Sequence, residues 1–393
     1  MKPMEILENV YWVGVIDWDE RDFHGFEIVR GATYNAYLII DKKITLVDTV
    51  KHKFFPEMIE RIKQVIDPSQ IDYIISNHVE MDHSGSLVGM KKIAKDATIV
   101  CTQKGKYGLC KYFDCGDWEF RVVRTGDEIK IGKRTLMFLE MRMLHWPDNM
   151  ATYVKEDKLL LSNDAFGQHI ASVERFDEEI GVDEAIKWAK IYYANILMPF
   201  GNLIKKKLKE IGDLGLQFNM IAPSHGVIWR NPEKIIESYA KWANFENENK
   251  VVIVYDTMWK STAKIAKAIA DGAATKAKVR MFHVRRDALS EIMTEILDAK
   301  AIAIGSPTMH NTVFPPVAGF LAYMKGLKPK NKIGLAFGSY GWSGGATKEI
   351  NRVFEELRFE VMEPLEVMYK PTREELEMAY DVGVELGKRA SKT

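Results

Sequence analysis

The chain has little cysteine and no excess of charge of either sign. Only three of its 393 residues are cysteine, at positions 101, 110 and 115, and no two are spaced as CxxC. This pattern excludes a disulfide framework, a thiolate zinc site and a rubredoxin-type iron site. The 55 basic residues equal the 55 acidic residues, so bulk charge gives no reason to expect nucleic acid or an anionic membrane as a partner.

Long apolar segments are absent as well. The segment MKPMEILENVYW has no apolar signal core, and no stretch approaches the ~20 apolar residues that a membrane span needs. We therefore expect a cytoplasmic protein. A length of 393 residues with 47% hydrophobic and 28% charged residues exceeds what one hydrophobic core usually supports, which predicts two domains.

Two patterns of secondary structure follow one another along the chain. Up to about residue 248, short strand-like runs such as NAYLII and KLLLSND mix with helical periodicity, as in residues 56–66. After that point, the apolar strands VVIVY, KVRMFHV, AIAIG, KIGLAFG and VMEPLEV alternate with amphipathic helices, which is typical of a parallel, doubly wound sheet. We predict a mixed α and β domain over residues 1–248 and a doubly wound α/β domain over residues 249–393.

Four side chains with metal-binding chemistry crowd into SNHVEMDHSG, residues 76–85: His78, Glu80, Asp82 and His83. On a helix His78 and Asp82 would share a face but Glu80 would lie opposite, so the helical zinc motif HExxH does not fit, and a loop after the strand IDYII is predicted instead. Three further candidates follow other apolar runs: His145, Asp164 and His225. One such residue alone is more often a turn or capping residue, but seven nitrogen and oxygen donors without cysteine predict a two-metal site.

These residues carry a family resemblance. The set resembles the metal ligands of the metallo-β-lactamase fold, an αββα sandwich that holds two metals, and YNAYLIIDKKITLVDT is similar to its opening hairpin. Zinc hydrolases of that fold have His where this chain has Glu80, and a carboxylate there favours iron or manganese over zinc. With Glu, the pattern resembles the flavodiiron proteins. The resemblance implies that His78, Glu80 and His145 hold one iron, that Asp82, His83 and His225 hold the other, and that Asp164 bridges them.

Other histidines and one tryptophan stand near this set. His169, five residues after Asp164 in FGQHIA, is a candidate proton donor close to the diatomic ligand, with a histidine of a surface loop as the alternative. Trp146, next to His145, is expected to shield the site. The three histidines without matching context are expected to be structural: His24, His52 and His283.

Three loops in the second half of the chain suit a flavin. DTMWKST, residues 256–262, leads into a helix, and its hydroxyl and backbone N–H groups form a phosphate cradle, with an ordinary N-cap as the alternative. GSPTMHNTVFPP and GSYGWSGGA follow the third and fourth strands, and doubly wound folds bind ligands at such carboxyl ends. No GxGxxG follows a strand, so direct binding of NAD or FAD is not supported.

Together these loops resemble those of flavodoxin, and in particular the flavodoxin module of the flavodiiron family. The resemblance implies FMN, contacted by Thr257, Met258, Trp259, Lys260, Ser261, Thr262, Pro307, Thr308, Met309, His310, Asn311, Ser339, Tyr340, Gly341, Trp342 and Gly345. Lys260 stands where such loops commonly have Gly, and it would either add charge near the phosphate or point to solvent. His310 stands where Asn is expected, and it is a second candidate proton donor.

The two resemblances imply one activity. The chain would be an oxidoreductase that takes electrons from a separate small redox protein, with rubredoxin favoured, and passes them through FMN to two irons that reduce O2 to water or NO to N2O. The family also implies a head-to-tail homodimer, or a dimer of dimers, in which FMN of one chain lies beside the irons of the other. The alternatives are a zinc hydrolase of lactamase fold fused to a flavodoxin-like domain, and a non-enzymatic electron carrier or sensor.

Overall fold

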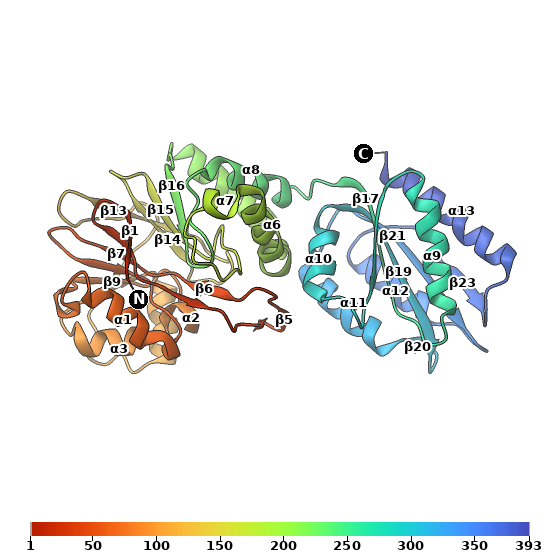
Figure 1. Cartoon of the computed structure of the whole chain (residues 1–393), viewed down its shortest axis with the longest axis horizontal. Coiled ribbons are helices and arrows are strands. Elements are labelled where there is room, and N and C mark those ends of the chain that lie inside the picture. The colour runs from red at the N-terminus through yellow and green to blue at the C-terminus, as the bar shows by residue number, and fades with distance from the viewer. Residues whose placement is uncertain (1, 393) are drawn as a thin grey trace. The chain divides into compact units, whose positions relative to one another are not determined.

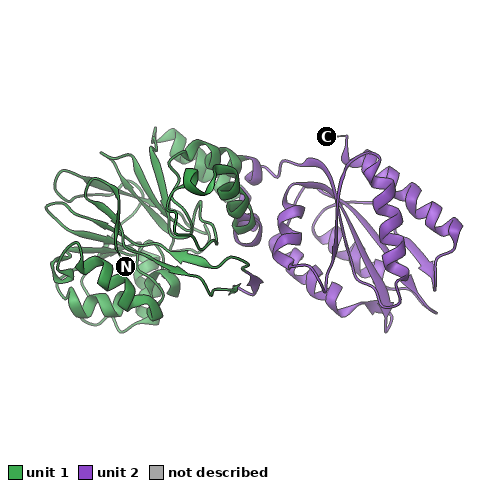
Figure 2. Cartoon of the chain, viewed as in Figure 1, with its two compact units in different colours: residues 1–23, 28–192, 202–240 green, residues 24–27, 193–201, 241–393 purple. Residues whose placement is uncertain are grey.

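The structure, a computed structural model, describes residues 2–392, which form two compact units. Unit 1 comprises the residues up to Phe23, Ile28–Tyr192 and Asn202–Ala240, and unit 2 comprises His24–Glu27, Tyr193–Gly201 and the residues from Lys241 onward (Figure 2). The boundary after residue 248 stays a prediction. No helix among the described residues has the length and apolar character needed to cross a lipid bilayer.

Unit 1 contains two large β-sheets (Figure 1). The first has the order β1 (Met4–Leu7), β2 (Val10–Trp12), β7 (Tyr37–Ile39), β8 (Thr45–Val47), β9 (Tyr73–Ile75), β10 (Thr98–Cys101), β11 (Phe120–Val122). The second has the order β12 (Glu128–Lys130), β13 (Thr135–Glu140), β14 (Met150–Val154), β15 (Leu159–Asn163), β16 (Met220–Pro223). Strand pairs are antiparallel up to β8 in the first sheet and up to β15 in the second, and the remaining pairs are parallel.

A hydrophobic core lies between these two sheets. Val47 and Ile75 of the first sheet belong to the same buried cluster as Phe138 and Leu161 of the second. The other face of the first sheet packs against helices, which contribute buried side chains such as Met58. Strands covered on both faces are apolar at every position rather than at alternate ones, and β14, β15 and β16 are buried throughout. This is the predicted αββα sandwich.

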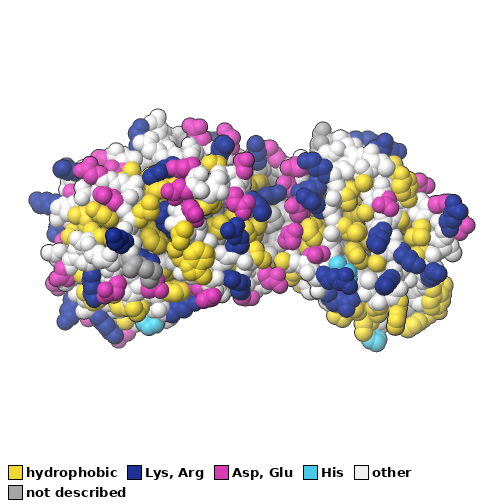
Figure 3. All heavy atoms as spheres, in the orientation of Figure 1, with side chains coloured by type: hydrophobic (Ala, Val, Ile, Leu, Met, Phe, Trp, Pro, Cys, Tyr) yellow, Lys and Arg dark blue, Asp and Glu magenta, His cyan; other side chains and the backbone are white. Residues whose placement is uncertain are grey.

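Helices and short strands complete unit 1. The helices are α1 (Phe55–Lys63), α2 (Met81–Ser84), α3 (Leu87–Ile93), α4 (Gln103–Tyr112), α5 (Asp177–Ile180), α6 (Val182–Tyr192), α7 (Gly201–Asp213) and α8 (Pro232–Ala243), with 3-10 turns at His52–Phe54 and Pro68–Gln70. A small ribbon pairs β3 (Val15–Asp17) with β6 (Ala32–Tyr34), and β4 is Asp22–Phe23. Charged side chains of both signs are interspersed on the face seen in Figure 3, as the balanced composition leads one to expect.

Unit 2 is built on one mostly parallel sheet. Its order is β18 (Lys278–His283), β17 (Glu248–Tyr255), β19 (Ala299–Met309), β21 (Ile333–Tyr340), followed by β22 (Glu360–Val361) and β23 (Leu365–Met368), which both pair with β21. In chain order this is 2-1-3-4-5, the order of flavodoxin-like doubly wound sheets. The predicted single strand 361–367 is wrong, because Pro364 has no N–H for the ladder and divides it into β22 and β23.

Helices surround the sheet of unit 2: α9 (Ser261–Ala274), α10 (Leu289–Leu297), α11 (Pro315–Leu327), α12 (Ala346–Glu356) and α13 (Arg373–Ala390). The unit also contains β5 (Phe26–Glu27), β20 (Thr312–Val313), a π-helical turn at Tyr193–Leu197 and a 3-10 turn at Met198–Phe200. Two glycines let α9 and α13 touch backbone to backbone, because a Cβ on Gly272 would collide with the Tyr380 carbonyl and a Cβ on Gly383 with the Ile269 carbonyl.

Candidate metal centre and flavin pocket

Seven side chains with metal-binding chemistry meet in unit 1. His78 and Glu80 follow β9, Asp82 and His83 lie on α2, and His145, Asp164 and His225 follow β13, β15 and β16. The structure brings together every residue that the sequence analysis selected for this site. The predicted loop after β9 extends only to Glu80, because helix α2 begins at the next residue. This helical turn directs Asp82 and His83 toward the same interior as Glu80.

The first group consists of His78, Glu80, His145 and Asp164, whose donor atoms lie within 4.8 Å of one another. The Nε2 atom of His78 is 3.3 Å from Oε2 of Glu80 and 3.6 Å from Oδ2 of Asp164. The Nε2 atom of His145 is 3.4 Å from each of the same two oxygens. Two imidazoles and two carboxylates at such distances form a cage for one cation.

The second group consists of Asp82, His83 and His225, also within 4.8 Å of one another. The Oδ2 atom of Asp82 is 3.4 Å from Nε2 of His83 and 3.2 Å from Nε2 of His225. All three side chains are buried. This group contains one carboxylate of its own, so a second carboxylate has to come from elsewhere.

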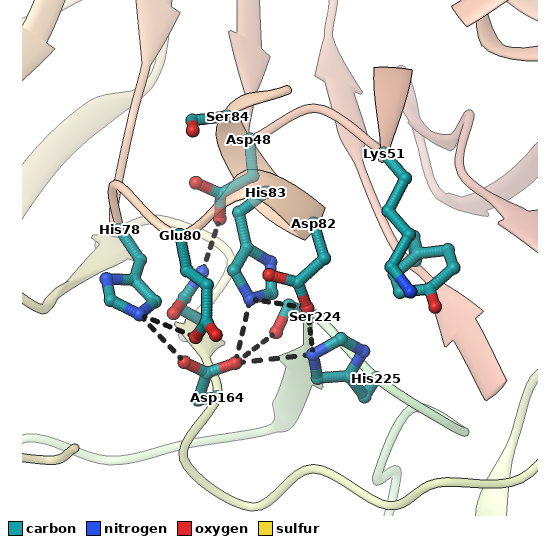
Figure 4. Close-up of polar contacts among 12 residues, drawn as sticks. Asp48, Lys51, His78, Glu80, Asp82, His83, Ser84, Asp164, Ser224 and His225 are labelled. Carbon is teal, nitrogen blue, oxygen red and sulfur yellow. Dashed lines mark hydrogen bonds and ion pairs between the residues drawn. The ribbon is translucent and has the colours of Figure 1, made fainter. Parts of the chain in front are cut away.

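Asp164 supplies that carboxylate, since its two oxygens face opposite groups (Figure 4). Oδ2 faces His78 and His145 at 3.6 and 3.4 Å, whereas Oδ1 faces His83 and His225 at 3.0 and 3.4 Å. Ser224 Oγ donates a further hydrogen bond to Oδ1 at 3.1 Å. A carboxylate placed this way can contact two cations at once, one through each oxygen.

The inward-facing atoms fit metal ions better than they fit one another. Both carboxylate oxygens of Asp82, Oδ2 of Asp164, and Nε2 of His83 and of His225 are buried without a hydrogen-bond partner among the described residues. Buried polar atoms of this kind are costly unless something satisfies them. Nitrogen and carboxylate oxygen donors without sulfur suit iron or manganese, so the residues present fit a two-metal centre.

Two hydrogen bonds behind the ligands set the orientation of the rings. The Nδ1 atom of His78 lies 2.8 Å from Oδ2 of Asp148, which also accepts the backbone N–H of Val79 at 2.8 Å. The Nδ1 atom of His225 lies 2.7 Å from the carbonyl oxygen of Thr33. Because these acceptors require a proton on Nδ1, they leave the lone pair of Nε2 for a metal. Neither Asp148 nor Thr33 is predicted from the sequence.

The charges of the site hold one another in their ionised forms. Burial opposes the imidazolium form, but Asp164 and Glu80 raise the pKa of His145 to about 9, and Asp164 and Asp82 raise the pKa of His225 to about 10. Burial likewise opposes the carboxylate of Asp164, but the surrounding histidines hold its pKa well below its ordinary value. A cation that binds here therefore displaces protons from histidines.

Two predicted neighbours of the site are in place. His169 is buried, with its ring centroid 5.2 Å from that of His225 and 4.8 Å from that of Tyr192, which rules out the surface-loop alternative. Its role as a proton donor stays a prediction. The ring centroid of Trp146 lies 5.1 Å from that of His78, so this indole does cover one side of the first group.

A cavity of about 630 Å³ opens at the carboxyl ends of the strands in unit 2. It is lined by Thr257, Met258, Trp259, Ser261, Lys264, Pro307, Thr308, Met309, His310, Ser339, Tyr340, Gly341, Trp342, Tyr369 and Lys370. Of the residues predicted to contact FMN, four do not line it: Lys260, Thr262, Asn311 and Gly345. Three lining residues were missed: Lys264, Tyr369 and Lys370. The volume and the exposed indoles of Trp259 and Trp342 suit a planar aromatic ligand.

Three of the residues that do not line the cavity still shape its walls. Lys260, before the first turn of α9, has a φ of 70°, the left-handed region in which glycine is favoured, which explains why such loops commonly have Gly there. His310 and Asn311, with φ of 52° and 60°, form the two-residue turn between β19 and β20. The hydroxyl of Thr262 is buried and lies 2.9 Å from that of Ser339, which ties two of the loops together.

The loop before α9 is braced from behind. The guanidinium of Arg285 binds both oxygens of the buried Asp256 and donates to the carbonyl of Thr257 at 2.8 Å. Asp256 in turn accepts the backbone N–H of Thr257. The hydroxyl of Thr257 is buried without a hydrogen-bond partner among the described residues. This brace holds a hydroxyl and the N-terminus of α9 in the arrangement that binds a phosphate.

Comparison with known proteins decides the family. Residues 32–226 match the family described as "ODP family beta lactamase", and residues 253–383 match "Flavodoxin". The chain is 46% identical to a nitric oxide reductase of Moorella thermoacetica over 99% of each chain. The structure of the flavodiiron protein from Giardia intestinalis matches with a TM-score of 0.96 and 36% identity, over 99% of this chain and 97% of that one. The chain belongs to the flavodiiron protein family.

A third relative agrees with this assignment. The rubredoxin oxygen:oxidoreductase of Desulfovibrio gigas matches with a TM-score of 0.97 and 39% identity, over 99% of this chain and 98% of that one. The flavodiiron chain described here is accordingly an oxidoreductase, with a metallo-β-lactamase-like unit and a flavodoxin-like unit. Both resemblances drawn from the sequence motifs, and the fold that they implied, are confirmed.

Proposed function

We propose that this flavodiiron protein takes electrons from a small redox protein, passes them through FMN to a non-haem diiron centre, and there reduces O2 to water, NO to N2O, or both. The observation that carries the proposal is the position of Asp164, which turns one oxygen to each of two buried groups of ligands. The carboxylate of Glu80 in the first group favours iron over zinc, and a redox function needs a redox-active metal.

Each of the two groups of ligands would hold one iron. His78, Glu80 and His145 would hold one iron, Asp82, His83 and His225 the other, and Asp164 both. When bound, two adjacent irons supply electrons to both ends of O2 or to two molecules of NO. Both reductions also consume protons.

Protons have to reach metal ligands that are mostly buried. His169 lies behind His225, in ring contact with Tyr192, and we assign it the role of a proton donor. His310, the second candidate proton donor, lies on an exposed turn of unit 2.

FMN would occupy the cavity of unit 2, with its phosphate at the N-terminus of α9 and its ring near Tyr340 and Trp342. FMN accepts a pair of electrons and releases them singly, which suits a relay between a one-electron donor and iron. The Moorella relative is named for NO and the Desulfovibrio relative for rubredoxin and oxygen. These names support both substrates and favour rubredoxin as the donor. Placement in the cytoplasm stays a prediction.

The decisive experiment uses the full chain purified under anaerobic conditions. Metal and flavin analysis should find two irons and one FMN per chain, and reduced rubredoxin should then drive consumption of O2 and of NO in separate assays. Zinc in place of iron, together with esterase or lactamase activity, would support the hydrolase instead. FMN without consumption of either gas would support an electron carrier.

We further propose a head-to-tail homodimer, in which FMN of one protomer serves the irons of its partner. A monomeric form, obtained by dilution or by mutation of the interface, should keep both cofactors but lose electron transfer from FMN to iron. Rapid mixing of reduced protein with O2 would reveal this as reoxidation of iron without reoxidation of flavin. A monomer with full activity would contradict the proposal.

A further inference from the structure

The segment after β23 forms a wall of the flavin cavity that no motif indicates. Tyr369 and Lys370 both line the cavity. Tyr369 has a φ of 57°, and its backbone N–H donates to the Tyr340 carbonyl at 2.7 Å. A non-glycine residue in the left-handed region costs about 1 kcal/mol or more and is retained where the surroundings enforce it. The strained residue turns the chain so that Lys370 stays at the rim of the cavity.

Tyr369 also fixes the position of this wall relative to the loop after β21. Its Cε1 atom lies 3.5 Å from where a Cβ of Gly341 would be, so the ring rests against the backbone of that loop. At the same time Tyr369 is 63% exposed. A large aromatic side chain that is held in place yet left uncovered has the properties of a surface for a planar ligand.

The cavity carries charge of one sign only. Lys264 and Lys370 are its two ammonium groups, and none of the described lining residues is Asp or Glu. Of the carboxylates on neighbouring segments, Asp256 is paired with Arg285, whereas Glu366 accepts from the hydroxyl of Thr347 and does not line the cavity. The two lysines are therefore the full charges among the described lining residues.

These two lysines stand at opposite ends of the cavity. Lys264 belongs to the first turn of α9, which follows β17, whereas Lys370 follows β23. The sheet order β17-β19-β21-β23 places three strand spacings between them, or roughly 14 Å at the usual separation of strands. If the phosphate binds at the N-terminus of α9, the isoalloxazine ring extends toward β21 and β23, and Lys370 lies at the ring end.

We propose that Lys370 favours the reduced form of FMN and thereby raises its reduction potential, whereas Lys264 binds the phosphate. The inference rests on the proposed function, because it assigns a role to residues of the same FMN site. Reduction adds negative charge to the ring, and a cation near the ring stabilises that charge. The phosphate keeps its charge on reduction, so a cation near the phosphate strengthens binding of both forms equally.

The two roles predict different ratios between the affinity for reduced FMN and the affinity for oxidised FMN. Replacing Lys370 by Met should weaken binding of reduced FMN about three- to tenfold more than binding of oxidised FMN, the effect of one exposed charge close to the ring. For this two-electron couple the fold-change corresponds to a potential lowered by about 14–30 mV. Lys264→Met should weaken binding of both forms by the same factor and leave the potential unchanged.

The test uses the full chain loaded with FMN. The dissociation constant of oxidised FMN is measured by fluorescence titration, and the reduction potential of bound FMN by equilibration with redox dyes, for the native chain and for Lys370→Met, Lys370→Arg, Lys264→Met and Lys388→Met. Lys388 is exposed on α13, away from the cavity, so it controls for the loss of a charge. We expect the lowered potential only in Lys370→Met, with the native value in Lys370→Arg.

An unchanged potential in Lys370→Met would overturn the assignment, and if the affinity for both forms of FMN were then weaker by the same factor, Lys370 would lie at the phosphate. A potential lowered equally in Lys388→Met would also overturn it, since the shift would then reflect total charge. Failure of the proposed function looks different, because the native chain would then bind no FMN, or would bind FMN without consuming O2 or NO when reduced rubredoxin is supplied, whatever the potential of Lys370→Met.

Discussion

Asp148 offers the sharpest test of the metal centre, since it touches a ligand without being one. Its Oδ2 atom accepts a hydrogen bond from Nδ1 of His78 and another from the N–H of Val79, both at 2.8 Å, and the side chain is 4% exposed. Asp148→Asn keeps the shape of the side chain, and the amide oxygen can still accept a hydrogen bond. The negative charge that holds the proton on Nδ1 is lost.

The expected loss of metal affinity follows from these two bonds. A hydrogen bond to a charged acceptor is worth about 1.5–3 kcal/mol and a neutral one about 1 kcal/mol, so exchanging two costs about 1–4 kcal/mol. At about 1.4 kcal/mol per tenfold, the affinity of the first group should fall roughly 5- to 700-fold. Loss of such outer partners typically costs 10- to 100-fold.

The assay is competition for iron against a chelator of known affinity, with the absorbance of FMN as an internal measure of an intact second unit. Asp177→Asn is a matched control, because Asp177 is fully buried and accepts the backbone N–H groups of Arg230 and Asn231 but contacts no metal ligand. We expect weaker iron binding in Asp148→Asn alone. Unchanged affinity in a folded Asp148→Asn protein would refute the role given to this carboxylate.

Three further outcomes are expected. Asp164→Asn should lower iron occupancy in both groups while FMN stays bound, as metal and flavin analysis would measure; loss from one group alone would contradict a bridging role. In metal-depleted protein the raised pKa values of His145 and His225, about 9 and about 10, stabilise the fold below pH 6.5, and this stabilisation is lost as the pH rises through these values. Metal binding should accordingly release protons and strengthen from pH 6 to 9, which calorimetry in buffers of different ionisation enthalpy can test; a pH-independent affinity would argue against these charges. Gly383→Ala should lower the free energy of unfolding by about 1–3 kcal/mol, because the added Cβ meets helix backbone. Gly319→Ala on α11, whose added Cβ meets nothing within 4 Å, should raise the free energy of unfolding by up to about 1 kcal/mol. Urea unfolding would measure both values.

The metal-facing residues could be predicted because they stand in segments that follow apolar strands, four of them in a single run of six residues, which is a local pattern. The groups behind them could not. Asp148 and Thr33 reach His78 and His225 across 70 and 192 positions, and neither stands in a recognisable motif. One signal was available for Asp148, which follows His145 by three positions in HWPDN.

The residues of the flavin pocket are likewise of two kinds, those that the sequence predicts and those that it does not. Loops rich in glycine and hydroxyl groups were recognisable from their residues, whereas Lys264 and Lys370 look like ordinary exposed lysines until the sheet order brings them to one cavity. The broken fifth strand shows a different limit, because a run of alternating apolar residues outweighed Pro364 in the prediction. The role and conformation of such residues depend on their position in the tertiary structure, which local sequence propensity does not indicate.

The shared carboxylate of Asp164 has a consequence for how the centre assembles. Ser224 and the facing histidines hold both oxygens in place, so with a single ion bound one oxygen would be engaged and the other would still point at the neighbouring group. A second ion would then meet a ligand whose orientation is already settled, and it need not displace the first. Either group could therefore load first, and the second loading would not require Asp164 to turn.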